Sequence, residues 1–110
     1  MNIKTLNRIS GAYMVYEATC LDVHEDGFNI HHIPGADYEC TYFPFDTFAL
    51  VTCSGDNLLS MLEFNNGRDD AAIPCTVAVG DPYVFIIRHK TGPVLNYQMN
   101  TLRCASVYER

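Results

Sequence analysis

Short runs of β-forming residues, separated by turn-forming residues, extend along this whole chain. The runs are rich in Val, Ile, Thr, Tyr and Phe, which favour strands. The interruptions supply the Gly, Pro, Asn and Asp that turns need: they are 26–27, 34–35, 54–56, 65–67, 80–82 and 91–93. Such a rhythm is typical of small antiparallel barrels and sandwiches. Because the chain has 110 residues and no repeat or linker, we expect one mainly β domain over 1–110.

The strands themselves are expected where apolar residues alternate or cluster between turns. They are 12–24, 28–31, 38–42, 47–52, 73–79, 83–89 and 94–108. The last segment is either one strand or two, because its apolar alternation changes parity near Asn100. One or two short helices are also expected. Apolar residues recur every third position over 3–9, which favours a helix, and 58–64 fits either a helix capped by Asp56 or a strand. Pro44 predicts a bend or a sheet edge.

The first half of the chain, about 1–54, resembles the outline of a small SH3-like or Sm-like barrel. The outline consists of a short N-terminal helix, a long bent strand, a tight hairpin, and a strand entered through the sequence FPFDTFALV. This resemblance implies a compact barrel for that half.

The hairpin centred on Asp26-Gly27 leads to a specific site hypothesis. A two-residue type I′ loop there would pair Asp22 with His31 and His24 with Asn29. The same register puts the apolar residues of both strands on the opposite face. Cross-strand neighbours on one face are close enough to share a metal ion, so Asp22, His24 and His31 are candidate metal ligands. The alternative is a solvated polar face in which His31 hydrogen-bonds Asp22.

Charge is distributed unevenly along the sequence. Residues 9–67 contain nine carboxylates and no Lys or Arg, giving −9, while the remainder has seven basic and four acidic residues, giving +3 and a net charge of −6. A one-signed segment repels nucleic acid and attracts cations or basic protein surfaces. Direct nucleic-acid binding is therefore disfavoured, and a basic protein, which could itself belong to a nucleic-acid-binding complex, is the expected partner.

Several of these carboxylates share turns or loops with aromatic residues, a combination suited to an arginine-rich surface. The candidate partner-binding residues are Glu25, Asp26, Asp37, Tyr38, Glu39, Tyr42, Phe45 and Asp46. Small size and one-signed charge also fit phage-encoded inhibitors, such as anti-CRISPR and anti-restriction proteins, that block a basic partner sterically. The alternative is a structural β protein that forms a homodimer or larger homo-oligomer, using the strand 83–87, which is apolar on both faces.

Other functional classes find little support in the sequence. There is no G-x-S-x-G motif and no phosphate-binding glycine loop, so neither catalytic residues nor a cofactor is expected. The five cysteines form no C-x-x-C pair, which favours reduced thiols in a cytoplasmic protein over one disulfide and a spare thiol. The first ten residues lack the apolar run of a secretory signal. We expect no membrane association.

Overall fold

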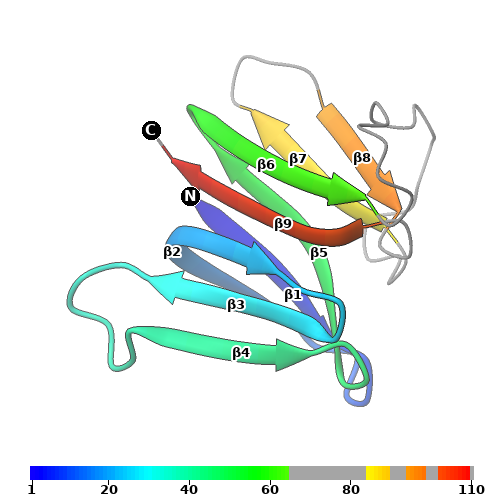
Figure 1. Ribbon diagram of the computed structural model, residues 1–110. Helices are drawn as coiled ribbons and strands as arrows, with labels where there is room; N and C mark the ends of the chain where they lie inside the picture. The colour runs from blue at the N-terminus through cyan, green and yellow to red at the C-terminus, as the bar shows by residue number, and fades with distance from the viewer. Residues whose placement is uncertain (65–83, 90–93, 99–101, 110) are drawn as a thin grey trace.

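The computed structural model describes residues 1–64, 84–89, 94–98 and 102–109, and this part of the chain contains nine strands and no helix (Figure 1). The strands are β1 (Asn2–Asn7), β2 (Tyr13–Val23), β3 (Gly27–His32), β4 (Cys40–Pro44), β5 (Phe48–Gly55), β6 (Leu58–Phe64), β7 (Val84–His89), β8 (Val94–Gln98) and β9 (Leu102–Glu109). The mainly β prediction is confirmed. The expected strand 73–79 lies outside the described residues.

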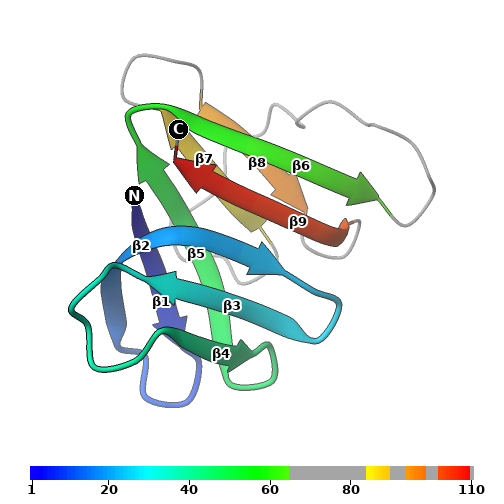
Figure 2. The same ribbon diagram turned by 60° about the vertical axis from the view of Figure 1, so that its left-hand side comes forward.

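The strands form two sheets that share β2, the long strand predicted over 12–24. In the first sheet the order is β2-β1-β5-β7-β8, and in the second it is β4-β3-β2-β9-β6. All pairs are antiparallel except β5 with β7. The chain passes from the first sheet to the second within β2, returns to the first at the turn between β4 and β5, and passes to the second again at the turn between β5 and β6 (Figures 1 and 2). The described strands do not close into a barrel, and the SH3-like outline stays a prediction.

The helix predicted over 3–9 is wrong, because 3–7 lie in strand β1 and 8–9 lie in the turn that follows it. Both edges of β1 are paired, with β2 on one side and β5 on the other. Ile3 and Thr5 are buried, and Lys4 between them is less so. This two-residue alternation is that of a strand, and hydrogen bonds along both edges outweigh a local apolar spacing that would suit a helix. The ambiguous segment 58–64 is likewise a strand, β6, paired with β9.

The tight hairpin loop at Asp26-Gly27 is also wrong, although its face assignment is confirmed. Val23 pairs with Phe28 rather than Ile30, which shifts the register by two residues. Gly27 has no positive φ, as a type I′ turn would require. Instead, residues 24–26 connect the two strands, and the backbone N–H of His24 donates to the Gly27 carbonyl at 2.8 Å. A shift of two residues keeps every side chain on its face, because side chains alternate with a period of two.

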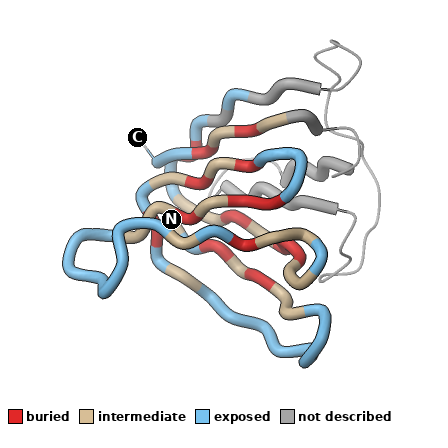
Figure 3. Tube along the Cα trace, turned by 60° about the horizontal axis from the view of Figure 1, so that its bottom comes forward, coloured by how far each residue is buried: buried red, intermediate tan, exposed pale blue. Residues whose placement is uncertain are grey.

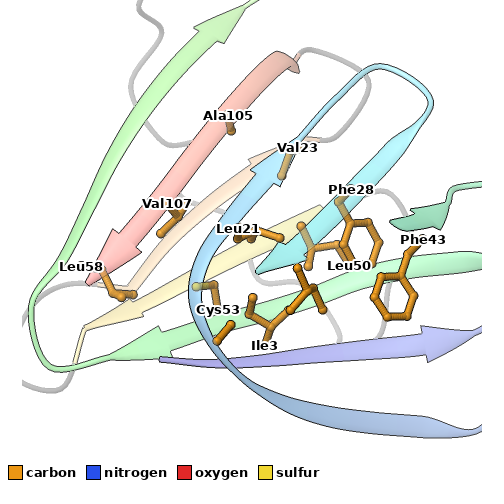
Figure 4. Close-up of a cluster of buried hydrophobic side chains, with 12 residues drawn as sticks. Ile3, Leu21, Val23, Phe28, Phe43, Leu50, Cys53, Leu58, Ala105 and Val107 are labelled. Atoms are coloured by element: carbon orange, nitrogen blue, oxygen red, sulfur yellow. The ribbon is translucent and has the colours of Figure 1, made fainter. Parts of the chain in front are cut away.

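The core lies between the two sheets and draws on both. Figure 3 shows buried residues recurring along the strands, and Figure 4 shows Ile3, Leu50 and Cys53 of the first sheet facing Leu21 and Phe28 of the second. These five side chains are fully buried. The inward-facing positions of β2 leave its intervening residues on the outer surface of the second sheet, where the polar side chains collect.

Two proline turns place the loops at the ends of the second sheet. Gly35 has a φ of 92° and follows Pro34, and the N–H of Ala36 donates to the Ile33 carbonyl at 3.3 Å. This is the predicted turn between β3 and β4, which needs glycine for its positive φ. Pro44 ends β4, which pairs only with β3 in the described part of the chain, so its predicted edge position is confirmed.

Among the described residues, none belongs to a helix suited to crossing a membrane.

Candidate functional site

The outer face of the second sheet carries a polar cluster that we call the Asp22 cluster: Cys20, Asp22, His31 and Ser106. Strand β2 is central, with β3 on one edge and β9 on the other. Cys20 is paired directly with His31, and Asp22 is paired directly with Ser106. The β2-β3 hairpin and β9, a strand remote from it in sequence, therefore bring four chemically active side chains to one place.

Asp22 is the centre of the cluster's hydrogen bonds. His31 Nε2 lies 2.7 Å from Oδ2 of the carboxylate, and Ser106 Oγ donates to Oδ1 at 2.8 Å. Cys20 Sγ lies 3.8 Å from the same Oδ1 and 3.9 Å from Ser106 Oγ. The side chains of Asp22 and His31 are 33% and 40% exposed, so the cluster is accessible from solvent.

These neighbours move the pKa values of two members in opposite directions. Burial tends to raise the pKa of Asp22, but the hydrogen bonds from Ser106 and His31 outweigh it and hold that pKa below its ordinary value. Burial raises the pKa of the Cys20 thiol, and the Asp22 charge raises it further, against the hydrogen bond with Ser106. Asp22 is therefore an anion at neutral pH, and Cys20 keeps its proton in the ion-free protein.

This arrangement favours ligand binding over nucleophilic catalysis. In a Ser-His-Asp triad the histidine stands between the nucleophile and the carboxylate, whereas here the Asp22 carboxylate stands between Ser106 and His31. The thiol of Cys20 is not activated by a lowered pKa. One ligand atom from each of Cys20, Asp22 and His31 lies within 4.8 Å of the other two. Sulfur, oxygen and nitrogen donors in that grouping can hold a metal ion.

A hollow adjoins the cluster on the same face. Its volume is about 380 Å³, and it is lined by Asp22, Val23, His24, Met61, Cys104, Ala105 and Ser106. Asp22 and Ser106 belong to both the cluster and the wall of the hollow. Met61 is 66% exposed at its rim. A molecule bound in the hollow would therefore contact two members of the cluster.

The structure brings together two of the three residues predicted as metal ligands. Asp22 and His31 are in contact, but diagonally, because Asp22 pairs with Asn29. His24 lies beyond the end of β2, lines the hollow, and is not part of the ligand group. Cys20 takes its place. The alternating pattern put Cys20 on the same face as Asp22, so the sequence contained that signal, but nothing in it pointed to the pairing with Ser106.

The residues predicted to bind a partner are divided between the two ends of β3 and β4. Glu25, Asp26 and Asp46 lie in the loops at one end, where the Phe45 N–H donates to the Asp26 carbonyl at 2.9 Å. Asp37, Tyr38 and Glu39 lie in the loop 33–39 at the other end (Figure 1). Six strand residues at about 3.3 Å each separate the ends by roughly 17–20 Å. The candidate partner-binding residues therefore do not form one surface, because β3 and β4 run between the two groups.

Phe45 also differs from the expectation of a free docking side chain. It is half-buried and packs against the core, with its ring centroid 5.6 Å from that of Phe28. Tyr38 and Tyr42, by contrast, are 72% and 48% exposed. Aromatic character alone does not separate core residues from surface residues, since the exposed Tyr42 and the half-buried Phe45 are only three positions apart.

No protein family, curated protein or solved structure significantly matches this chain.

Proposed function

We propose that this protein is a binding module that docks one acidic end of its second sheet on a basic surface of a partner protein. The docking surface, which we call the acidic tip, consists of Glu25, Asp26, Tyr42 and Asp46. The observation that carries the proposal is the convergence of three exposed carboxylates on two adjacent loops, next to an exposed tyrosine.

The carboxylates of the acidic tip are not neutralised by ion pairs within the described part of the chain. The ion pairs found there are Met1 with Glu109 and His31 with Asp22. Arg8 reaches the tip, but its Nη1 donates to the Phe45 carbonyl at 2.8 Å. Counting Arg8, the tip has a net charge of −2. Carboxylates close together repel one another, and arginines of a partner would relieve that repulsion.

Tyr42 supplies the aromatic part of this surface. Its hydroxyl and ring edge lie against Gly27, so the side chain extends along β4 towards the loop that carries Glu25 and Asp26. An exposed tyrosine ring beside carboxylates can stack on a guanidinium group that the carboxylates also bind. Docking in this way would cover a basic surface and exclude nucleic acid from it, as anti-CRISPR and anti-restriction inhibitors do.

Two double charge reversals test whether the location of the charge matters. Glu25→Lys/Asp26→Lys changes the tip, and Asp37→Lys/Glu39→Lys changes the opposite loop. Both raise the formal net charge from −6 to −2. Binding to an immobilised arginine-rich peptide is measured at low and high salt. We expect the tip variant to lose about tenfold or more in affinity, equivalent to about 1.4 kcal/mol, and the loop variant to lose much less. Equal losses, or binding that does not respond to salt, would contradict the proposal.

A second candidate function is self-association. Tyr13, Met14 and Val15 on β2 are 46%, 52% and 60% exposed. Over this segment β2 pairs with β1, and its pairing with β3 begins only at Ala18, so within the described residues one edge is open to another strand. The side chains of 83–87, the strand predicted for this role, lie outside the described part of the structure, and the backbone of β7 is paired on both edges. A concentration-dependent mass by light scattering, abolished by Val15→Lys, would support a homo-oligomer, and a constant monomer mass would exclude it.

A further inference from the structure

We propose that Cys20, Asp22 and His31 form a binding site for one divalent ion of the zinc type. The ligands are Sγ of Cys20, one carboxylate oxygen of Asp22 and Nε2 of His31. The fourth coordination position is open on the exposed face of the second sheet. This site is separate from the acidic tip, and neither proposal depends on the other.

The ligand atoms are already near the positions that a tetrahedral ion requires. Zinc lies about 2.3 Å from sulfur and about 2.0–2.2 Å from nitrogen or oxygen, which places neighbouring ligand atoms about 3.4–3.6 Å apart. The His31 nitrogen and the Asp22 oxygen are 2.7 Å apart and must separate slightly. The Cys20 sulfur is 3.8 Å from the other carboxylate oxygen. Since all three ligand atoms lie within 4.8 Å of one another, movements of about 1 Å suffice.

The types of donor select the type of ion. Calcium and magnesium bind almost entirely through oxygen, and this group offers a single carboxylate. Thiolate and imidazole ligands favour zinc and related transition metals. On binding, the Cys20 thiol loses its proton to solvent, and the Asp22 and His31 hydrogen bond is replaced by two bonds to the ion.

The surroundings of the three ligands suit a site with an exchangeable position. Three protein ligands with a fourth position open to water are the pattern of catalytic zinc rather than structural zinc. Ser106 donates to Asp22 Oδ1 and would orient the carboxylate from behind the ligand group. The hollow of about 380 Å³ shares Asp22 and Ser106 with the cluster, so a small ligand on the ion would have space beside it.

The site is tested by adding Co²⁺ and Zn²⁺ to the full chain after chelator treatment. We expect one ion per chain by native mass spectrometry, and a thiolate-to-cobalt charge-transfer band in the Co²⁺ spectrum. Both measurements use the unaltered protein, so they do not depend on whether a variant folds. Failure to bind either ion, or a cobalt complex without the thiolate band, would overturn the proposal.

Variants assign the ligands. Cys20→Ser should remove the thiolate band, and His31→Gln should weaken Co²⁺ binding at least tenfold. Ser106→Ala, which alters a positioning residue, should weaken it about 10–100-fold with the band retained. Cys40→Ser is the matched control and should bind as the parent does, since Cys40 is exposed and outside the ligand group. A band that persists in Cys20→Ser, or Co²⁺ binding that is unchanged in His31→Gln, would show that the ion is bound elsewhere.

Discussion

Phe45→Ala distinguishes a core residue from a docking residue, because the two roles predict different effects on stability. Phe45 packs on the core cluster, and its ring lies 5.6 Å from the fully buried Phe28. Replacing a fully buried Phe with Ala costs about 3–5 kcal/mol. Phe45 is half-buried, so we expect about 1.5–3 kcal/mol. Its backbone hydrogen bond to Asp26 does not involve the side chain and should survive.

The measurement is urea unfolding followed by far-ultraviolet circular dichroism and by tyrosine fluorescence, since the chain has no tryptophan. Tyr38→Ala is the control: this side chain is 72% exposed, and its removal should change the free energy of unfolding by less than about 0.5 kcal/mol. If Phe45→Ala costs no more than Tyr38→Ala, Phe45 is not part of the core, and the reasoning that removes it from the docking surface fails.

Two further predictions concern titratable groups. Burial tends to raise the folded-state pKa of Asp22, but the hydrogen bonds from Ser106 and His31 lower it. The Asp22 charge therefore stabilises the fold at pH values above the ordinary aspartate pKa of about 3.9. This contribution to stability is lost as the pH falls through the folded-state pKa. The difference in unfolding free energy between the parent and Asp22→Asn should therefore shrink in acid; a constant difference from neutral to acid pH would contradict the assignment. Burial raises the pKa of Cys53 to about 12. Iodoacetamide at mildly alkaline pH should therefore label the exposed Cys40 and spare Cys53 until urea unfolds the chain, and peptide mass spectrometry would report the labelled sites. Equal labelling of the two thiols in the folded protein would refute this prediction.

The sequence predicted the strands well where the apolar alternation was long and turns marked both ends. The strand expected over 12–24 is β2 (Tyr13–Val23), and 94–108 contains two strands, β8 (Val94–Gln98) and β9 (Leu102–Glu109). The prediction from sequence was wrong at 3–9, where the local spacing of apolar residues favoured a helix. Residues 3–7 lie in a strand because they hydrogen-bond β2 and β5 along both edges, and a pairing partner more than forty residues away leaves no local signal.

For the candidate sites, too, the sequence predicted some features and the tertiary structure decided others. Alternation along β2 and β3 was enough to put Asp22 and His31 on one outer face, because a side chain's face depends only on the parity of its position. The structure alone decided the register of this hairpin, which differs by two residues from the predicted one and pairs Cys20 with His31. It also decided that β9 brings Ser106 to Asp22. These depend on loop packing and on contacts across more than eighty residues.

The one-signed segment 9–67 is a property of the sequence alone, and so is the chemistry available within it. How that charge is grouped was decided by the tertiary structure. Strands β3 and β4 carry Glu25, Asp26 and Asp46 to one end and Asp37 and Glu39 to the other, while Asp22 is held by neighbours from two other strands. Composition determines how many charges a chain has, but the lengths and pairing of its strands determine which of those charges act together.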